Sequence, residues 1–380
     1  MLEALDEFSR RPARSLTSLP RCQVTAERMG SWSKDSRQSR TSGGDMAERA
    51  AADRHVPVML DRCVGLLVAG AESIRAQGSI PVVIDATLGM GGHSEALLRS
   101  SDDLQVIGLD RDPQALEMAG ERLISFGSRF RGVRTVYDRV DEVAEEHLQP
   151  GQQLAGVLFD LGVSSLQLDE AERGFAYSYD APLDMRMDSS EDSPDESVAE
   201  LLARVDEQEL RGIIREYGED RSAGRIARAV VARQRVTPFT TTQDLAQVID
   251  QAVPAVAKRT GGHPAKRTFQ ALRIAVNREL EVLSEALPHA LDALDLGGRA
   301  VVLSYHSLED RITKRAFAAR TTSSAPAGLP VELEEHKPTY RAVTRGAEGP
   351  EEQEIAANPR AASAKCRSVE KIRTAMRSER

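Results

Sequence analysis

Apolar residues in the middle of the chain follow two alternating patterns. Short runs of consecutive apolar residues, typical of strands buried on both faces, are separated by stretches in which apolar residues recur every three or four positions, as in helices. Strands that alternate with helices predict a parallel sheet covered on both faces. The expected strands are residues 81–85, 105–109, 131–137, 154–159 and 300–304, and the expected helices are residues 58–69, 93–100 and 113–125.

The pattern changes after Gly162. Between residues 166 and 270 the apolar spacing is helical and is interrupted by prolines, and no good strand is present. This pattern predicts an all-helical domain, residues 166–270, inserted into an α/β domain made of residues 46–165 and 271–380. The other expected elements are a single helix over 268–294, a long loop over 320–365 and a closing strand over 366–373.

The first 45 residues are rich in Ser and Arg and lack any periodic apolar pattern, so they predict a disordered leader. They contain no apolar stretch of the kind found in secretory signals, and their six acidic residues argue against a transit peptide. Met46 opens a plausible shorter start of translation. No apolar run reaches the roughly 18 residues that a membrane-spanning helix needs.

Composition narrows the class of protein further. The cysteines, Cys22, Cys63 and Cys366, are far apart and form neither a CxxC pair nor a cluster with His, which argues against a disulfide framework and a zinc site. This use of cysteine fits a reducing cytosol. The chain carries a net charge of −9, yet residues 211–278 hold 13 Lys and Arg against 5 Asp and Glu. That segment can bind a polyanion, or it can be a solvated helical surface.

The first expected strand ends at Asp85 and leads into a glycine turn, Thr87-Leu88-Gly89-Met90-Gly91-Gly92-His93. Glycines allow a tight turn and a close approach of the backbone to a ligand. The N–H groups at the start of the following helix suit a carboxylate or a phosphate. The second strand ends at Asp110, 21 residues after Gly89, where a carboxylate can accept hydrogen bonds from ribose hydroxyls. This order predicts a nucleotide-type cofactor.

A glycine turn followed by an acid also occurs in NAD sites, so an NAD-dependent oxidoreductase is an alternative. Two features favour S-adenosylmethionine. The turn is Gly-Met-Gly-Gly rather than GxGxxG, and Asp85 directly before it would repel a pyrophosphate, although Asp85 can also be a helix or turn cap. A third acid, Asp160, ends the fourth strand. Because ligands lie at the carboxyl ends of central strands, Asp85, Asp110 and Asp160 are expected around one crevice.

Eight ordered motifs closely resemble those of the bacterial RsmH (MraW) family, the 16S ribosomal RNA cytosine-N4 methyltransferases. The resemblance covers about residues 55–375. The motifs are His55–Leu60, Asp85–Ser94, Asp110–Pro113, Asp160–Asp169, Glu172–Phe175, Pro182–Asp188, Arg267–Arg273 and Tyr305–Arg311.

The resemblance implies an α/β fold, a class I Rossmann-like S-adenosylmethionine methyltransferase sheet with the inserted all-helical domain. It implies a cytoplasmic enzyme that uses S-adenosyl-L-methionine, without a metal, to methylate the N4 amine of a cytidine in the decoding region of 16S rRNA, within the small ribosomal subunit and away from membranes. A homodimer stays open. A non-catalytic ribosome-assembly factor that keeps the fold is the second alternative.

By motif, the resemblance also implies roles for individual residues. Gly91, Gly92 and His93 would hold the methionine end of the cofactor, and Asp110 would hold the ribose. Tyr137 stands where the family has a Phe that packs on adenine. Asp160 and Gln167 would line the site near the adenine and the reacting centre.

Methyl transfer to a cytosine amine requires a group that accepts the N–H bonds as positive charge develops. Asp160 suits this role, with a backbone carbonyl or Ser164 sharing it. His306, just past the strand at 300–304, is a second candidate, although a lone His is often structural. Ser307 and Asp310 have the spacing of a capping box.

RNA contact is expected from the inserted domain, which predicts a role in substrate recognition. Arg225 and Arg228 fall with Arg221 on one expected helix face, away from Ile226 and Val230, and Lys266 and Arg267 lie at a helix start. Arginines and lysines placed in this way suit RNA phosphates. A salt-bridged structural helix is the alternative.

Overall fold

The computed structural model describes residues 57–188, 190, 192–254, 263–326 and 332–374. The leader expected over residues 1–45 and the start expected at Met46 lie outside the described residues. Cys63 and Cys366 are buried free thiols. No helix of the described ranges has both the length and the apolar character needed to cross a membrane.

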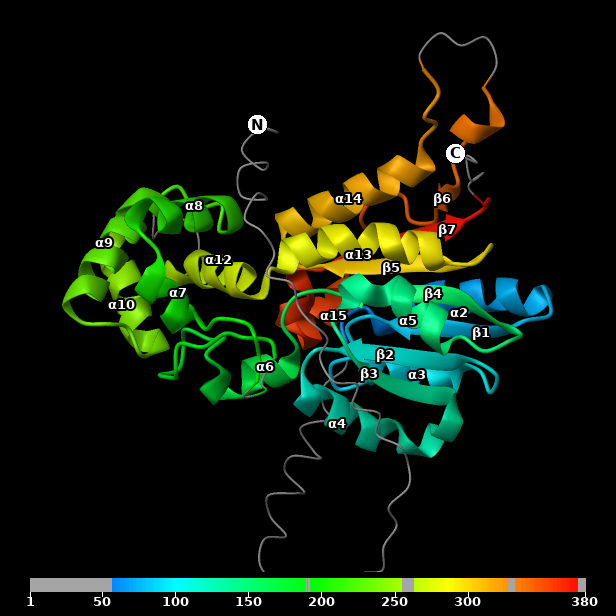
Figure 1. Cartoon of the computed structure of the whole chain (residues 1–380), viewed down its shortest axis with the longest axis horizontal. Helices are drawn as coiled ribbons and strands as arrows, with labels where there is room; N and C mark the ends of the chain where they lie inside the picture. Colours follow the sequence, from blue (N-terminus) through cyan, green and yellow to red (C-terminus); the bar gives the residue numbers. More distant parts are fainter. Residues whose placement is uncertain (1–56, 189, 191, 255–262, 327–331, 375–380) are drawn as a thin grey trace, which may run out of the picture. The chain divides into compact units, whose positions relative to one another are not determined.

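A sheet of seven strands forms the centre of the described chain (Figure 1). Its order is β3-β2-β1-β4-β5-β7-β6. The first five strands are parallel, and β7 pairs antiparallel with both β5 and β6. The strands are β1 (Ile80–Asp85), β2 (Gln105–Asp110), β3 (Phe130–Arg134), β4 (Gln152–Asp160), β5 (Arg299–Ser304), β6 (Tyr340–Ala342) and β7 (Lys365–Lys371). The expected parallel sheet is confirmed, with strand bounds that differ by one to three residues.

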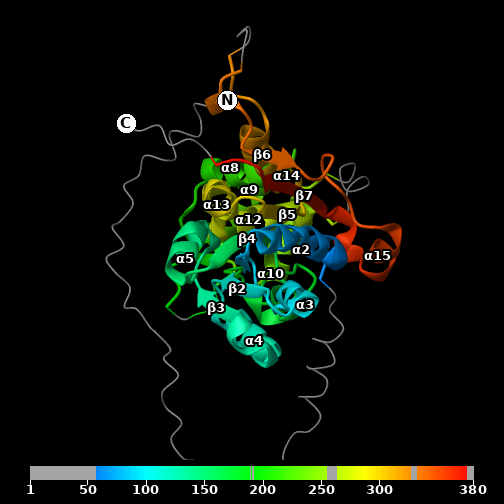
Figure 2. The same ribbon diagram turned by 90° about the vertical axis from the view of Figure 1, so that its right-hand side faces the viewer.

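Helices cover both faces of the sheet. Figure 2 shows α5 and α13 on one side of the strands and α2 and α3 on the other. These helices and their neighbours are α2 (Leu60–Ala76), α3 (Gly92–Ser100), α4 (Pro113–Leu123), α5 (Val140–His147), α13 (Glu279–Ala293) and α14 (Ser307–Thr321). Burial on both faces explains why the central strands β1, β2, β4 and β5 consist mostly of consecutive apolar residues.

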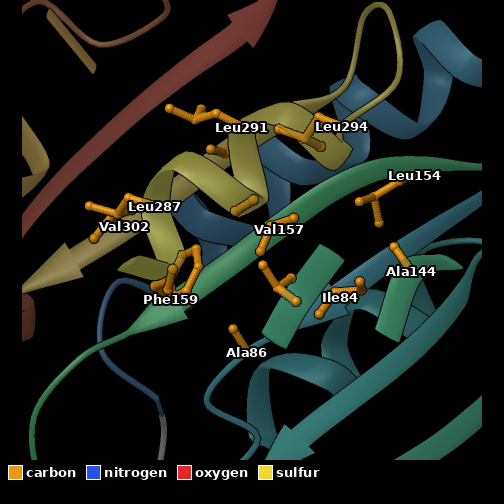
Figure 3. Close-up of a cluster of buried hydrophobic side chains, with 14 of the residues drawn as sticks. Ile84, Ala86, Ala144, Leu154, Val157, Phe159, Leu287, Leu291, Leu294 and Val302 are labelled. Atoms are coloured by element: carbon orange, nitrogen blue, oxygen red, sulfur yellow. The ribbon is translucent and has the colours of Figure 1, made fainter. Parts of the chain in front are cut away.

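Successive side chains of β4 pack into two different hydrophobic cores, one on each face of the sheet. Val157 and Phe159 belong to the core under α5 and α13, whereas Leu158, between them, belongs to the core under α2. In Figure 3, Val157 and Phe159 lie with Leu287 and Leu291 of α13. This packing fixes the end of β4, and with it the position of the residue that follows, Asp160.

The region between β4 and α13 is helical and has its own core. Its helices are α6 (Ser165–Asp169), α7 (Val198–Arg204), α8 (Glu207–Tyr217), α9 (Ala223–Val236), α10 (Thr242–Ala252) and α12 (Ala265–Asn277). In the described part of this region, the sole β-pairing is a single bridge between Pro182 and Thr241. Leu210, Ile214 and Ile226 are among the buried residues that join these helices. Figure 1 shows α7 to α10 and α12 gathered together.

The single helix expected over 268–294 is wrong. The chain forms α12 and α13, which are separated at Arg278, a residue with a φ of 51°. Asn277 stabilises this break, because its side-chain amide donates to the carbonyls of Met185 and Arg273 and accepts from the N–H of Met187. Two of these bonds reach about 90 residues along the chain, so local periodicity does not reveal them.

The loop expected over 320–365 is also wrong in part. The antiparallel edge strand β6 and the short helix α15 (Glu352–Ala357) lie inside it. The strand is three residues long, and two of its residues are exposed, so it has no apolar run to mark it. The closing strand expected over 366–373 is confirmed as β7.

Candidate functional site

A cavity of about 530 Å³ lies at the carboxyl ends of β1, β2, β4 and β5. The strand order reverses between β1 and β4, which is where open parallel sheets bind ligands. Of the residues expected from the sequence to form the site, nine line this cavity: Gly92, His93, Asp110, Tyr137, Asp160, Ser164, Gln167, Lys266 and His306. The cavity therefore brings together most of the expected cofactor site and both expected catalytic residues.

The glycine turn between β1 and α3 depends on glycine for two reasons. Gly91 has a φ of 76°, a left-handed conformation, and a Cβ there would lie 3.1 Å from Leu123 Cδ1. A Cβ at Gly92 would lie 2.5 Å from Pro57 Cγ, which is too close. The turn thus packs tightly against its neighbours and begins α3 at the edge of the cavity, where the first N–H groups of the helix lack partners within it. Gly91 itself shapes the turn without lining the cavity.

Asp85 has a structural role. It is 1% exposed, its Oδ2 accepts a hydrogen bond of 2.7 Å from Ser94 Oγ, and its Oδ1 accepts one from the N–H of Thr87. These bonds tie the end of β1 to α3. Of the two interpretations given to Asp85 by the sequence, the contacts favour the cap. Of the three acids at strand ends, Asp110 and Asp160 border the cavity.

Asp110 stands at the end of β2. Its Oδ2 accepts from the N–H of Gly89 and its Oδ1 from the N–H of Asp112, both at 2.9 Å. Burial raises the pKa of its carboxyl to about 6, although these backbone hydrogen bonds oppose the rise. The carboxylate is thus held in one orientation and linked directly to the glycine turn.

Asp160 is held by two other strand ends. Tyr305, directly after β5, donates a hydrogen bond of 2.7 Å from its hydroxyl to Asp160 Oδ1. The N–H of Asp160 donates to Thr87 Oγ1, and Asp160 Oδ2 lies 3.6 Å from His93 Nδ1. Burial raises the pKa of the Asp160 carboxyl to about 7, even though the bond from Tyr305 opposes this rise. Burial also lowers the pKa of the His93 imidazole, so that this ring is neutral at neutral pH.

Tyr305 is a site residue that sequence reasoning missed. It lines the cavity, and burial raises its pKa well above the usual range, so its hydroxyl keeps its proton and acts as a donor. The sequence feature that could have identified Tyr305 is its position directly after an apolar strand, which pairs with the strand that ends at Asp160.

Tyr137 and Gln167 line the cavity in different ways. The ring of Tyr137 packs edge-on against Phe159, with the ring centres 5.6 Å apart. Gln167 forms a capping box at the start of α6, since its Oε1 accepts from the N–H of Ser164 and the Ser164 hydroxyl accepts from the N–H of Gln167. Ser164, which the sequence offered as a helper in catalysis, thus serves as a helix cap.

His306 is the N-cap residue of α14 and lies 3.1 Å, through Nε2, from Glu309 Oε1. Glu309 is 2% exposed, and its Oε2 accepts from the N–H groups of Tyr305 and His306. Burial alone would raise the pKa of Glu309, but His306, the N–H of Tyr305 and the charge of Arg273 together outweigh burial and hold the pKa below its usual value.

The capping box expected from Ser307 and Asp310 is wrong. His306 and Glu309 occupy these roles one residue earlier. The Ser307 hydroxyl instead donates to Glu219, and Asp310 pairs with Arg367. A His at the N-cap is an unusual choice, which explains why the Ser was favoured from sequence.

The four residues expected to bind RNA fall in two places. Lys266 lines the cavity at the start of α12, whereas Arg267, beside it, donates to the backbone carbonyl of Glu219. Arg225 and Arg228 line a separate groove between α8 and α9, and Arg228 lies 3.3 Å from Glu207.

The helix face expected for the arginines needs one correction. The helix α9 begins at Ala223, so Arg221 lies before the helix rather than on it. Arg225 and Arg228 are exposed while Ile226 and Val230 are buried, as expected. Within the described ranges, no group of three His, Cys, Asp or Glu side chains is arranged to hold a metal ion.

Comparison with known proteins gives consistent matches. The model of a family described as the MraW methylase family matches residues 52–372. The "Ribosomal RNA small subunit methyltransferase H" of Pseudarthrobacter chlorophenolicus is 56% identical over 86% of this chain and 97% of that protein. The protein of the same name from Renibacterium salmoninarum is 58% identical over 85% of this chain and 96% of its own length. A solved SAM-dependent O-methyltransferase from Thermotoga maritima aligns at 9% identity, covering 86% of this chain and 70% of that chain, with a TM-score of 0.35.

Proposed function

Because the chain belongs to the MraW methylase family, we propose that it transfers a methyl group from S-adenosyl-L-methionine to the N4 amine of a cytidine in the decoding region of 16S ribosomal RNA. Relatives that share over half of their residues with it are named for methylation of the small-subunit ribosomal RNA. The observation that carries the chemistry is the Asp160 carboxylate, held by Tyr305 in the same cavity as Asp110.

The residues of the cavity fit S-adenosylmethionine. Asp110 offers carboxylate oxygens suited to ribose hydroxyls, and the start of α3, with Gly91, Gly92 and His93, suits the methionine end. His93 Nε2 is buried and has no hydrogen-bond partner in the described part of the chain, which fits a polar ligand beside it. Tyr137 and Gln167 would border the adenine. When bound, this cofactor supplies a methyl group on a positively charged sulfur, which a nucleophile can attack.

Asp160 would position the attacking amine and accept its proton. The lone pair of the cytosine amine is delocalised into the ring, so the amine must be positioned and relieved of a proton as it gains positive charge. A carboxylate with a pKa of about 7 is suited to accept an N–H bond and then the proton. Because Tyr305 occupies Oδ1, the oxygen left for the amine is Oδ2.

His306 is the second proposed proton acceptor. It lines the cavity, and its Nε2 lies 3.1 Å from Glu309 Oε1. Its second proposed role is structural. As the N-cap residue of α14, His306 would hold the preceding residue, Tyr305, in position. Replacement of His306 by Asn, which preserves a capping side chain, separates the two roles, because a cap survives this change and a proton acceptor does not.

RNA would be held by the helical region, residues 166–270, as the substrate-recognition domain. Lys266 at the edge of the cavity and Arg225, Arg228 and Arg267 farther away are the proposed contacts. The target base would have to leave its stack to enter a cavity of this depth. We place the enzyme in the cytoplasm, with small ribosomal subunits as its substrate. The sequence leaves a homodimer open, and sedimentation of the purified protein decides between monomer and dimer.

The deciding experiment supplies labelled S-adenosylmethionine and small subunits from a strain that lacks the modification, followed by nucleoside analysis. The expected product is a cytidine methylated at N4. Binding of NAD without methyl transfer would favour the oxidoreductase. Binding of RNA without turnover, in the presence of cofactor, would favour a non-catalytic assembly factor. Methylation of another base or another atom would retain the enzyme class and overturn the proposed acceptor.

A further inference from the structure

A second cavity, of about 890 Å³, lies in the helical region, away from the cofactor site. It forms a groove between the carboxyl-terminal half of α8 and the beginning of α9. The charged residues that line it are Arg211, Arg215, Glu219, Asp220, Arg221, Arg225 and Arg228, which together carry five positive and two negative charges. We refer to this lining as the arginine groove.

Both acids of the arginine groove are already engaged. Glu219 accepts hydrogen bonds from Ser307 and from Arg311, the latter at 3.1 Å. Asp220 accepts a bond of 2.7 Å from the N–H of Ser222. Neither carboxylate neutralises an arginine of the groove, so the groove keeps its positive charge.

Four of the arginines are free to bind an anion. Arg228 pairs with Glu207, but across the described ranges no carboxylate lies within ion-pair distance of the other four arginines of the groove. Arg211 and Arg215, one turn apart on α8, are exposed. Planar guanidinium groups without partners match phosphate oxygens well, because each can donate two parallel hydrogen bonds.

The arginine groove is built on fixed elements. Leu210, Ile214 and Ile226 bury the opposite faces of α8 and α9 in one core. A Cβ at Gly224 would lie 3.7 Å from Cδ and Nε of Arg211, which places the Arg211 side chain over the first turn of α9. That turn adds the positive end of a 14-residue helix, and Ser222 at its N-cap makes no capping bond through its side chain within the described structure.

The arginine groove also lies close to the side of the cofactor cavity that His306 lines. Glu219 lies in the groove, and its partners Ser307 and Arg311 are on α14, directly after His306, which lines the cofactor cavity. A polyanion in the groove therefore passes close to the residues that follow Tyr305. A nucleic acid whose target base enters the cavity carries its neighbouring phosphates into this region.

We propose that the arginine groove binds the phosphates of the RNA strand that flanks the target nucleotide, with Arg211 and Arg215 as contacts beyond Arg225 and Arg228. This proposal rests on the proposed function. RNA is favoured over an acidic protein segment because the chemistry of the neighbouring cavity already requires a nucleic acid, and because the groove offers guanidinium groups without lining aromatic or apolar anchors.

The test compares Arg211→Gln/Arg215→Gln with Arg235→Gln, an exposed arginine at the far end of α9. Binding of protein-free 16S rRNA is measured over a series of salt concentrations, together with binding of adenosylhomocysteine. The double variant should bind RNA about tenfold or more weakly, and its dependence of log affinity on log salt should be shallower by roughly 1.4 to 1.8, as expected for two lost phosphate contacts. Arg235→Gln and adenosylhomocysteine binding should match the wild type.

A second variant tests whether weaker RNA binding comes from the lost arginine charges or from misfolding. Gly224→Glu keeps all five arginines and adds a carboxylate beside Arg211, where a Cβ would be in ordinary van der Waals contact at 3.7 Å, so it should also weaken RNA binding. An unchanged salt slope in both variants overturns the proposal. So does normal binding of protein-free RNA combined with weaker binding of whole subunits, which would point to an acidic ribosomal protein. If the wild-type enzyme transfers no methyl group to RNA, the proposed function itself fails, which is a separate result.

Discussion

The hydroxyl of Tyr305 donates a hydrogen bond of 2.7 Å to Oδ1 of Asp160, joining the ends of the neighbouring strands β5 and β4. The bond leaves Oδ2 on the side of His93. It also favours the ionised carboxylate, because a donated hydrogen bond stabilises the negative charge. Tyr305 is therefore a positioning residue that orients the proposed acceptor and opposes the rise in its pKa that burial causes.

Tyr305→Phe should lower kcat roughly tenfold and move the pH profile toward higher pH. Activity that requires ionised Asp160 rises with pH through about 7 in the wild type. Loss of the donor raises this pKa further, so the midpoint of kcat/KM against pH should increase. The measurement is that profile for both proteins. A lower kcat with the wild-type midpoint would mean that the hydroxyl orients Asp160 without influencing its pKa.

Asp160→Asn should fold and lose at least about 100-fold in turnover, because an amide cannot take the proton. Adenosylhomocysteine binding, measured by calorimetry, serves as the control for an intact cofactor site. Near-normal turnover would remove Asp160 from the mechanism.

The same variant should be more stable than the wild type at pH 8. The pKa of Asp160 is about 7 when folded against an ordinary 3.8, so between these values the folded state binds more protons than the unfolded state. The unfolding free energy of the wild type therefore falls as the pH rises from about 4 to 7. The upper bound of this loss is about 4 kcal/mol, and Asn avoids it. Denaturant unfolding at pH 4 and pH 8 tests this, and a difference between the proteins that does not grow with pH would contradict it.

Gly92→Ala should reduce cofactor affinity and lower stability by about 1–3 kcal/mol, because the new methyl group would meet Pro57 Cγ at 2.5 Å. The matched control is Gly120→Ala in the middle of α4, where a Cβ meets nothing within 4 Å. This control should be neutral or stabilising by up to about 1 kcal/mol, since Ala favours a helix over Gly. Equal effects of the two changes would show that the tight packing of the glycine turn has no influence.

The sequence was sufficient for the parts of the fold that depend on local pattern. The buried strands were marked by unbroken apolar runs, and their order brought Asp110 and Asp160 to one edge of the sheet. The bond from Tyr305 to Asp160 joins residues 145 apart, and no local pattern encodes it. The arginine groove required knowledge of how α8 packs on α9. The bond from Arg267 to the Glu219 carbonyl also depends on how the helices pack, so the sequence alone does not reveal it.

A buried ion pair spans the break between α12 and α13. Arg273 and Glu279 stand on either side of it and form two hydrogen bonds, of 2.8 and 2.9 Å, with side chains only 13% and 8% exposed. Both residues line the cofactor cavity. The ion pair thus links the last helix of the helical region to the first helix after it, at the wall of the site.

Glu279→Gln should lower the unfolding free energy by about 3–5 kcal/mol, because it leaves the Arg273 charge buried without a partner. The matched control is Glu281→Gln, which removes an ion pair with Arg278 whose side chains are 53% and 64% exposed, and which should change stability by less than about 1 kcal/mol. Denaturant unfolding measures both. The double variant Arg273→Met/Glu279→Leu should recover much of the loss, since replacing both charges removes the cost of burying one alone. If the single variant is as stable as its control, the pair is not needed to hold the two helices, and the bonds made by Asn277 are sufficient to maintain the break.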